Sequence, residues 1–146
     1  MRGWLTGGRS RGPRVSALPG DLRLIVVTNR IPVAKGRESE FEDRFKRRAH
    51  LVHRSPGFIR NEVHRPRPMK FDQQLREFVP DPTQQAYYEV KTWWRSFQDF
   101  EDWTQSPAFA ETLDSRPPKE MFAGPNTLDV HEVFIESPCS GNLGAR

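Results

Sequence analysis

The first candidate for chemistry is Asn29, near the end of an apolar and β-branched segment. Apolar side chains fill positions 24–27, on both faces of a predicted strand. A polar side chain in such a segment needs a hydrogen-bond partner or a ligand. Two interpretations stay open on the residues alone: the amide binds a ligand, or it hydrogen-bonds a neighbouring turn.

The second candidate region is residues 87–109, which contain three of the four tryptophans. Phe97, Phe100 and Trp103 recur at helical spacing, and stripes of this kind usually belong to a core. We expect this stretch to build the core and to carry any site.

The histidines give little sign of a metal site. His50 and His53 lie near the end of a predicted helix, and we expect His131 to be a strand residue with an ordinary hydrogen bond. The sequence shows no Cys–His or Ser–His–Asp arrangement, glycine-rich phosphate loop or carboxylate pair. No metal ligands are therefore predicted.

The charge distribution argues against nucleic acid as a partner. The 146-residue chain has a formal net charge of +4. Four arginines in the first twenty residues supply the excess, and the rest holds 19 basic and 19 acidic residues. A neutral body with a basic tail lacks a dedicated phosphate-binding surface. No run approaches the roughly 18 apolar residues of a membrane span, so no membrane partner is expected either.

The single cysteine, Cys139, allows neither an intrachain disulfide nor a thiolate cluster within one chain. A reducing compartment fits this composition, and we expect a cytoplasmic protein. The alternative is an organelle, if residues 1–20, rich in Arg and Ser without acids, act as a transit peptide.

Hydrophobic periodicity predicts the elements that position the candidates. Strands are predicted over residues 22–33, 58–64, 86–94 and 128–135. Helices are predicted over residues 37–53 and after Ser96, with a restart at Ser106 and Pro107. We expect one domain at residues 21–136 between disordered tails at 1–20 and 137–146. Residues from about 66 to 86 are treated as an insertion, with one or two helical turns at 71–78.

The order strand, helix, strand, strand, helix, strand predicts an α+β fold, the ferredoxin-like βαββαβ unit. Two helices then cover one face of an antiparallel sheet. Because the strands look apolar on both sides, the second face also needs cover. We therefore expect a homodimer that packs face to face.

Three runs of sequence carry a family resemblance: NRIPVAKGRESEFEDRFKRRAHLVHRSPGFIRNEV, TWWRSFQDFEDWTQSPAF and PPKEMFAGPNTLDVHEV. Together they cover roughly residues 24–136 apart from the insertion. The chain resembles the antibiotic biosynthesis monooxygenase (ABM) domain family, and within it the haem-degrading branch. The resemblance implies a dimeric α/β barrel of two ferredoxin-like units, each with a pocket between sheet and helices.

The resemblance also implies roles for particular residues. In the haem-degrading branch an Asn at the end of the first strand and a Trp on the helix after the third strand serve catalysis. These match Asn29 in TNRIP and Trp103 in EDWTQS. The branch has an iron-ligating His ten residues beyond the Trp, and here that position is Leu113. A Leu side chain has no lone pair to donate to haem iron. His50, His53, His64 or His131 would have to replace it, which their predicted positions disfavour.

Two hypotheses for function follow. The first is a small dimeric ABM monooxygenase, which either degrades haem, as substrate and cofactor, or oxygenates a small aromatic molecule without a cofactor. In the cofactor-independent reaction the Asn would hydrogen-bond the substrate's oxygen anion, and the Trp would pack against the substrate's ring. The alternative is a non-catalytic dimeric protein that binds haem or a small apolar ligand, which the replacement of the His by Leu113 favours.

Overall fold

The computed structural model describes residues 23–48 and 51–138. Four strands form the main antiparallel sheet: β1 (Ile25–Ile31), β2 (Phe58–His64), β5 (Tyr88–Trp94) and β6 (Thr127–Glu132). Their order is β2-β5-β1-β6. This is the ferredoxin-like arrangement, so the predicted α+β fold class is confirmed.

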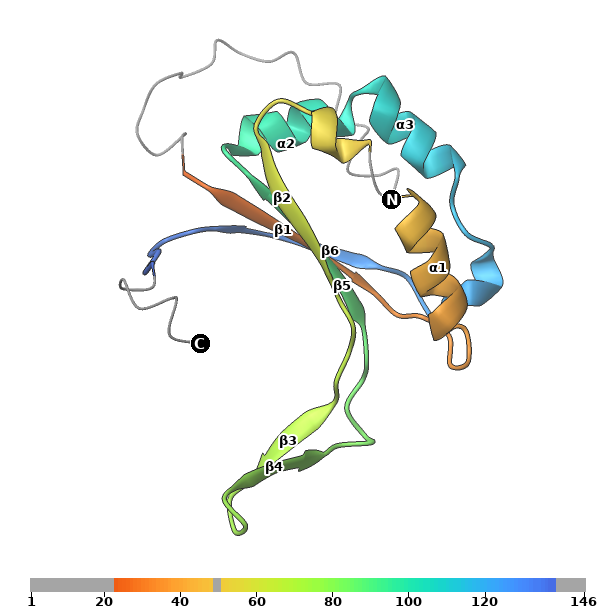
Figure 1. The fold of residues 1–146 in the computed structure, drawn as a ribbon, viewed down its shortest axis with the longest axis vertical. Coiled ribbons are helices and arrows are strands. Elements are labelled where there is room, and N and C mark those ends of the chain that lie inside the picture. Colours follow the sequence, from red (N-terminus) through yellow and green to blue (C-terminus); the bar gives the residue numbers. More distant parts are fainter. Residues whose placement is uncertain (1–22, 49–50, 139–146) are drawn as a thin grey trace.

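The helices lie on one side of this sheet (Figure 1). They are α1 (Glu38–Arg48), α2 (Phe97–Thr104) and α3 (Pro107–Asp114), with 3-10 turns η2 (Val52–Arg54) and η3 (Lys119–Met121). The predicted helix starts are confirmed: Ser96 Oγ accepts a hydrogen bond from the Asp99 amide at 3.1 Å, and Ser106 Oγ accepts one from the Phe109 amide at 3.2 Å. Pro107 occupies the first turn of α3, where its missing N–H costs nothing.

The core lies between the sheet and these helices. One buried cluster joins the β1 and β5 side chains to α2, and it comprises Ile25, Val27, Trp94, Phe100 and Trp103. A second cluster, with Phe41 against Tyr88 at a ring separation of 4.7 Å, joins α1 to the same strands. The expectation that residues 87–109 build the core is confirmed.

Several predicted boundaries differ from the structure. The strand expected over 22–33 spans only Ile25–Ile31, and the strand expected over 86–94 begins at Tyr88. Two further differences are larger. The helix expected over 37–53 does not run to its end, because Leu51 lies in a bend and residues 52–54 form the separate turn η2; Ala49 and His50 lie outside the described residues. The strand expected over 128–135 ends at Glu132, which pairs with Ile25 at the start of β1. The Val133 amide donates one further hydrogen bond, to the Leu24 carbonyl at 2.9 Å, and residues 133–138 form no strand.

The helical turns expected at 71–78 are also wrong. This segment forms an antiparallel hairpin of β3 (Met69–Asp72) and β4 (Glu77–Pro80). The Asp72 carboxylate accepts hydrogen bonds from the amides of Gln74 and Leu75, at 2.9 and 3.0 Å, and Arg76 adopts a positive φ of 55°. This local turn favours strand pairing over a helix. We call the segment 69–80 the hairpin arm.

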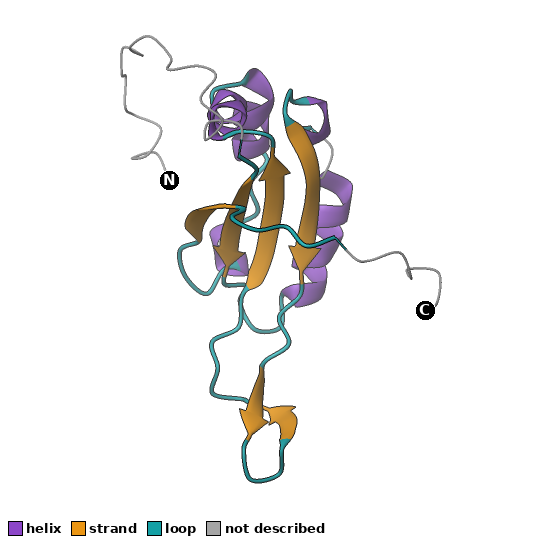
Figure 2. Ribbon diagram, turned by 90° about the vertical axis from the view of Figure 1, so that its left-hand side faces the viewer, coloured by secondary structure: helices purple, strands orange, loops and turns teal. Residues whose placement is uncertain are grey.

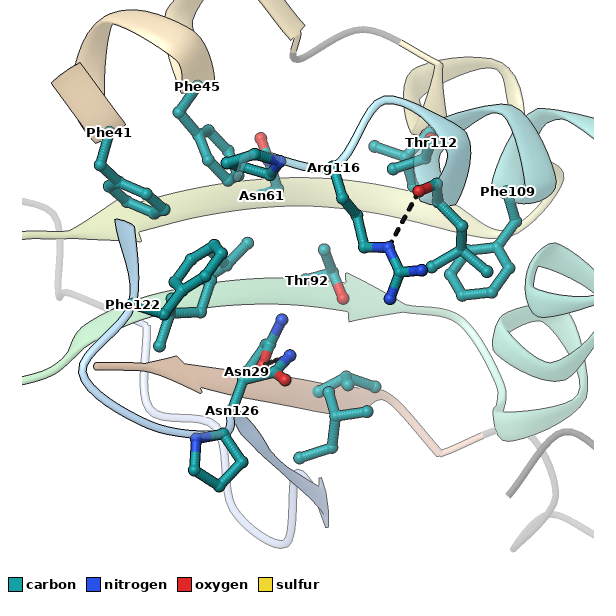
Figure 3. A pocket seen from close by; sticks show the side chains of 18 of the residues that line it. Asn29, Phe41, Phe45, Asn61, Thr92, Phe109, Thr112, Arg116, Phe122 and Asn126 are labelled. Carbon is teal, nitrogen blue, oxygen red and sulfur yellow. Dashed lines mark hydrogen bonds between the residues drawn. The ribbon is translucent and has the colours of Figure 1, made fainter. Parts of the chain in front are cut away.

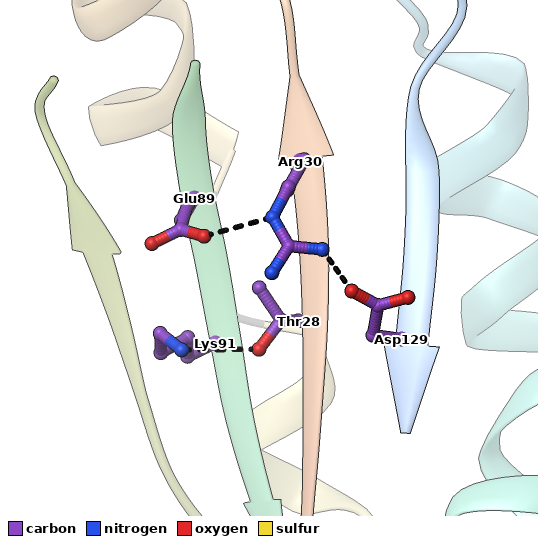
Figure 4. Close-up of polar contacts among 5 residues, drawn as sticks. All are labelled: Thr28, Arg30, Glu89, Lys91 and Asp129. Atoms are coloured by element: carbon purple, nitrogen blue, oxygen red, sulfur yellow. Dashed lines mark hydrogen bonds and ion pairs between the residues drawn. The ribbon is translucent and has the colours of Figure 1, made fainter. Parts of the chain in front are cut away.

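The expectation of an apolar second sheet face is wrong as well. The face away from the helices carries a charged network (Figure 4). Arg30 pairs with Glu89 at 3.1 Å and with Asp129, and Lys91 Nζ donates to Thr28 Oγ1 at 3.2 Å. Side chains along each strand point alternately to the two faces of the sheet. The register of β1, β5 and β6 places their polar side chains together on this face. Most of the tails expected at 1–20 and 137–146 lies outside the described residues.

Candidate functional site

A large pocket lies between the helix-covered face of the sheet and the helices, with a volume of about 1200 Å³. Ligand pockets commonly measure about 300–1,000 Å³, so this one can hold a multi-ring molecule. Aromatic side chains from several elements form much of its wall: Phe41, Phe45, Phe100, Trp103, Phe109 and Phe122. Planar apolar walls of this kind suit a planar aromatic ligand.

Asn29 lies on the sheet side of this pocket (Figure 3). Its Oδ1 accepts a hydrogen bond from Asn126 Nδ2 at 3.0 Å. Asn126 comes from the loop just before β6, so the bond also ties that loop to β1. An amide that accepts through its oxygen still carries two N–H donors. The bond to Asn126 confirms the interpretation of Asn29 as partner of a neighbouring loop, and a role as donor to a ligand stays a prediction.

A hydroxyl stands near this amide on the next strand. Thr92 on β5 also lines the pocket and pairs in register with Val27 of β1. Its Oγ1 accepts a hydrogen bond from the buried Trp94 indole at 2.8 Å. The Thr92 hydroxyl proton can then be donated elsewhere.

Trp103 on α2 also lines the pocket, but only 8% of its surface is exposed. Its ring meets that of Phe109 edge-on with a centroid separation of 5.6 Å. The indole is thus both a core side chain and a section of the pocket wall.

The rim of the pocket is mainly basic. Three charged residues line it: Asp114 at the end of α3, Arg116 in the following loop and Lys119 at the start of η3. Arg116 is held by a hydrogen bond from its Nε to the Leu113 carbonyl at 3.1 Å. Within the described part of the chain, neither Arg116 nor Lys119 forms an ion pair. Figure 3 shows the Arg116 side chain across the pocket from Asn29.

A cluster of charged and hydroxyl side chains, Glu42, Arg65 and Tyr88, lies next to the pocket residue Phe41, whose ring packs on that of Tyr88. The Arg65 guanidinium binds the Glu42 carboxylate at 2.8 and 2.6 Å, and the Tyr88 hydroxyl donates to the same carboxylate. These hydrogen bonds, first that of Arg65, lower the pKa of Glu42 to about 2. Burial, followed by the neighbouring carboxylate, raises the pKa of Tyr88 to about 12. Both effects keep the pair in one protonation state near neutral pH, which suits a structural tie between α1 and β5.

The family profile described as antibiotic biosynthesis monooxygenase matches residues 24–115. The chain belongs to the antibiotic biosynthesis monooxygenase family. It is 35% identical over 110 residues to a mycobilin-producing haem oxygenase of Mycobacterium tuberculosis, over 75% of this chain and 90% of that protein. It is 33% identical over 93 residues to a staphylobilin-producing haem oxygenase of Staphylococcus haemolyticus, over 64% of this chain and 76% of that protein.

Solved structures of this family agree with the fold. The haem-degrader MhuD of Mycobacterium tuberculosis, solved with two haems in its active site, superposes with a TM-score of 0.56 and 27% identity, over 78% of this chain and 99% of MhuD. SnoaB, a cofactor-independent oxygenase from Streptomyces nogalater, gives a TM-score of 0.54 at 18% identity, over 80% of this chain and 98% of SnoaB, and shows the shared fold.

The haem-degrading members of the family raise the question of an iron ligand. Leu113 lines the pocket from α3, and so does its neighbour Thr112, whose hydroxyl donates to the Ala108 carbonyl at 3.0 Å. Among the described residues of the pocket wall none carries an imidazole, thiol, thioether or phenol. The described wall therefore does not fit an axially ligated haem iron.

The other described histidines do not supply an iron ligand to the pocket. His53 is exposed and packs on Phe58 with a ring separation of 5.3 Å. His64 pairs with Glu62 at 2.8 Å, and His131 is exposed on β6. None of these three lines the pocket, and His50 lies outside the described residues. In the described chain no group of three His, Cys, Asp or Glu side chains is placed to hold a metal ion.

Sequence reasoning named Asn29 and Trp103 and missed the polar residues that line the same pocket. Asn126, Arg116 and Lys119 come from non-periodic loops, and only the proline-rich RPPK and GPN runs mark those loops in the sequence.

Within the described residues no helix is long and apolar enough to cross a bilayer.

Proposed function

We propose that this ABM-family protein is a monooxygenase that acts on an aromatic phenol carrying an acidic group, without haem ligated by the described pocket residues. The observation that carries the proposal is the Asn29 amide, oriented by Asn126 on the floor of a large aromatic pocket. The basic rim at Arg116 and Lys119 fits a carboxylate on the substrate.

The residues have distinct parts in this reaction. Asn29 Nδ2 donates a hydrogen bond to the phenolate oxygen formed when the hydroxyl loses its proton to water. This donor stabilises the anion, and such donors typically contribute about 10²–10³-fold in rate. Trp103 and the phenylalanines hold the ring plane and keep bulk water from it.

The chemistry needs only dioxygen as oxidant. The phenolate passes one electron to dioxygen, and the two radicals combine to form a carbon–oxygen bond at a ring carbon bearing hydrogen. The resulting peroxide anion takes back one proton from water and becomes a hydroperoxide. Loss of one water from this hydroperoxide leaves a quinone. The substrate supplies four electrons, one oxygen atom enters the product and the other leaves as water.

The test is oxygen uptake by the purified, chelator-treated protein with a panel of hydroxynaphthoic acids. The proposal expects enzyme-dependent uptake of one dioxygen per quinone formed, and slower turnover of the matching naphthols, which lack the carboxylate. Absence of uptake across the panel contradicts it.

A second candidate function is binding of a tetrapyrrole or small apolar ligand without catalysis. Leu113, at the position where the haem-degrading branch has its iron-ligating His, favours it. Titration with haem and with metal-free protoporphyrin IX tests this function. Equal affinities and no oxygen-dependent loss of the Soret band support binding alone, whereas loss of that band with ascorbate under air points to haem degradation, as in the named relatives.

We also propose that the chain works as a homodimer. The charged face of the sheet mixes both signs, Arg30 and Lys91 with Glu89 and Asp129, so it can complement a second copy of itself. Sedimentation equilibrium of the full chain tests this, and a monomer across micromolar concentrations contradicts it.

A further inference from the structure

The hairpin arm has one apolar face and one polar face. The register pairs Phe71 with Phe78 and Met69 with Pro80, and these four side chains share a face. The opposite face carries Lys70 with Val79 and Asp72 with Glu77. Phe71 and Phe78 meet edge-on, with ring centroids 5.3 Å apart.

This apolar face is not covered by the rest of the described chain. Figures 1 and 2 show the arm extending beyond the end of the main sheet. Phe71 is 51% exposed and Phe78 is 67% exposed. An isolated two-stranded hairpin is marginally stable in water, so a partner that covers the aromatic pair would stabilise the arm.

A second exposed apolar segment follows β6. Phe134 is 85% exposed and Ile135 is 71% exposed, the highest values among the large apolar side chains of the described chain. The segment 133–136 has four residues, as has each strand of the arm. At about 3.3 Å per residue both span roughly 13 Å.

Charge does not oppose a contact between these two surfaces. The arm holds two basic side chains, Lys70 and Arg76, and two acidic ones, Asp72 and Glu77, so it is neutral by count. Residues 133–136 hold one acidic side chain, Glu136, and no Lys or Arg. The exposed apolar side chains of the two surfaces therefore carry the pairing.

The topology places these surfaces at opposite corners of the sheet. The arm leaves from the β2–β5 edge, at the end where Tyr88 pairs with Ile31. The segment after β6 leaves from the other edge, at the end where Glu132 pairs with Ile25. Figure 1 shows both extending on the side away from the helices. A two-fold axis along the remaining diagonal, with the strands of the two sheets crossing, brings each arm to the partner's corner.

We propose that the apolar face of the hairpin arm docks on residues 133–136 of a second copy of this chain, so that two arms clasp the homodimer. Phe71 and Phe78 then pack against Phe134 of the partner subunit and Ile135 of the partner subunit. The inference rests on the homodimer proposed above and is independent of the reaction in the pocket.

Disulfide trapping tests the contact. In a Cys139→Ser background, a Phe78→Cys chain is mixed with a differently tagged Phe134→Cys chain and oxidised. The proposal expects a cross-link between the two tags in at least tenfold excess over a Val79→Cys chain mixed with the same partner, because Val79 lies on the opposite face of the arm. Cross-linking of Phe78→Cys to itself shows that the arms meet each other and overturns the proposal.

Dimer affinity gives a second, independent readout. We expect Phe71→Ser/Phe78→Ser to weaken dimerisation at least tenfold by sedimentation equilibrium, and Lys70→Ser/Val79→Ser to change it less than threefold. Circular dichroism confirms that each variant keeps the fold. A monomeric wild-type chain overturns both the homodimer and the clasp. A wild-type dimer with neither the cross-link nor the loss of affinity overturns the clasp alone.

Discussion

The amide of Asn29 illustrates how one residue can serve structure and chemistry together. Its oxygen holds Asn126 at 3.0 Å, which fixes the side-chain rotation and directs the N–H groups away from that bond. We therefore expect Asn126→Ala to lower turnover about 10-fold while leaving substrate affinity within about threefold, because Asn126 orients the donor. Steady-state oxygen uptake gives both constants. A change confined to KM would assign Asn126 to substrate binding instead.

The pocket wall at Leu113 makes a direct prediction about haem. Leu113 lines the pocket from α3, so an imidazole at this position would add to the pocket wall the donor that haem iron needs. We expect Leu113→His to bind ferric haem with a Soret band shifted to that of a His-ligated haem, and the wild-type chain to show no such shift. Ala110→His serves as control, because Ala110 is exposed on α3 and does not line the pocket. A wild-type spectrum that already reports a His ligand would contradict the assignment.

Among the elements, α2 depends on a close approach by Gly57. Gly57 has a φ of 81°, and a Cβ atom there would lie 2.1 Å from Asp99 Oδ2. Asp99 in turn forms the cap of α2 with Ser96. Gly57→Ala should therefore reduce the free energy of unfolding by about 2 kcal/mol or more, measured by urea denaturation.

The control for this substitution is Gly36→Ala. Gly36 has a φ of 90°, but a Cβ atom at this position would meet nothing within 4 Å, so it shares the backbone strain without the clash. We expect Gly36→Ala to lower the free energy of unfolding less than Gly57→Ala does. Equal losses at the two glycines would show that backbone strain alone explains the effect.

The contacts of Glu42 on α1 with Arg65 and with Tyr88 on β5 predict that the stability of the fold depends on pH. The pKa of Glu42 falls from 4.5 to about 2 in the folded chain, first through Arg65 and then through Tyr88. Because the folded pKa is the lower one, this carboxylate stabilises the fold above about pH 4.5, and the contribution disappears as the pH falls toward 2. Wild type should thus be more stable than Glu42→Gln at pH 6, with a gap that narrows toward pH 3 in urea titrations. A gap that is constant with pH would contradict this role.

The elements with strong local signals were predictable from the sequence. Ser96 and Ser106 start helices because their side chains cap them, and Asn29 stands out because it interrupts an apolar strand. The arm was not predictable as a hairpin, since its strands have only four residues each among several prolines. The charged sheet face was missed because Arg30, Glu89 and Asp129 belong to three strands, and only the register unites them.

The same limit applies to the site. Asn126, Arg116 and Lys119 lie in segments without periodicity, far along the chain from β1, and tertiary packing alone places them in the same pocket as Asn29. Their residue types are ordinary for loops. The aromatic part of the pocket wall could be predicted from the aromatic stripe of α2, whereas the polar rim of the pocket could not.

For the whole molecule, the pocket and the proposed dimer contacts lie on opposite faces of one sheet. The helices cover the face with the pocket, and the charged network and the hairpin arm belong to the other side. We expect variants of the arm to change the dimer affinity while the turnover per folded chain changes less than about twofold. A matched loss of both would show that the pocket depends on the partner chain.

The most direct test of the proposed site is the initial rate of oxygen uptake by Asn29→Ala, with Asn61→Ala as the matched control. Both asparagines line the pocket, but Asn126 donates its hydrogen bond to Asn29. The proposal predicts a loss of about 10²-fold or more for Asn29→Ala with the fold intact, and less than about fivefold for Asn61→Ala. Normal turnover by Asn29→Ala would contradict the assignment of this amide as the oxyanion donor.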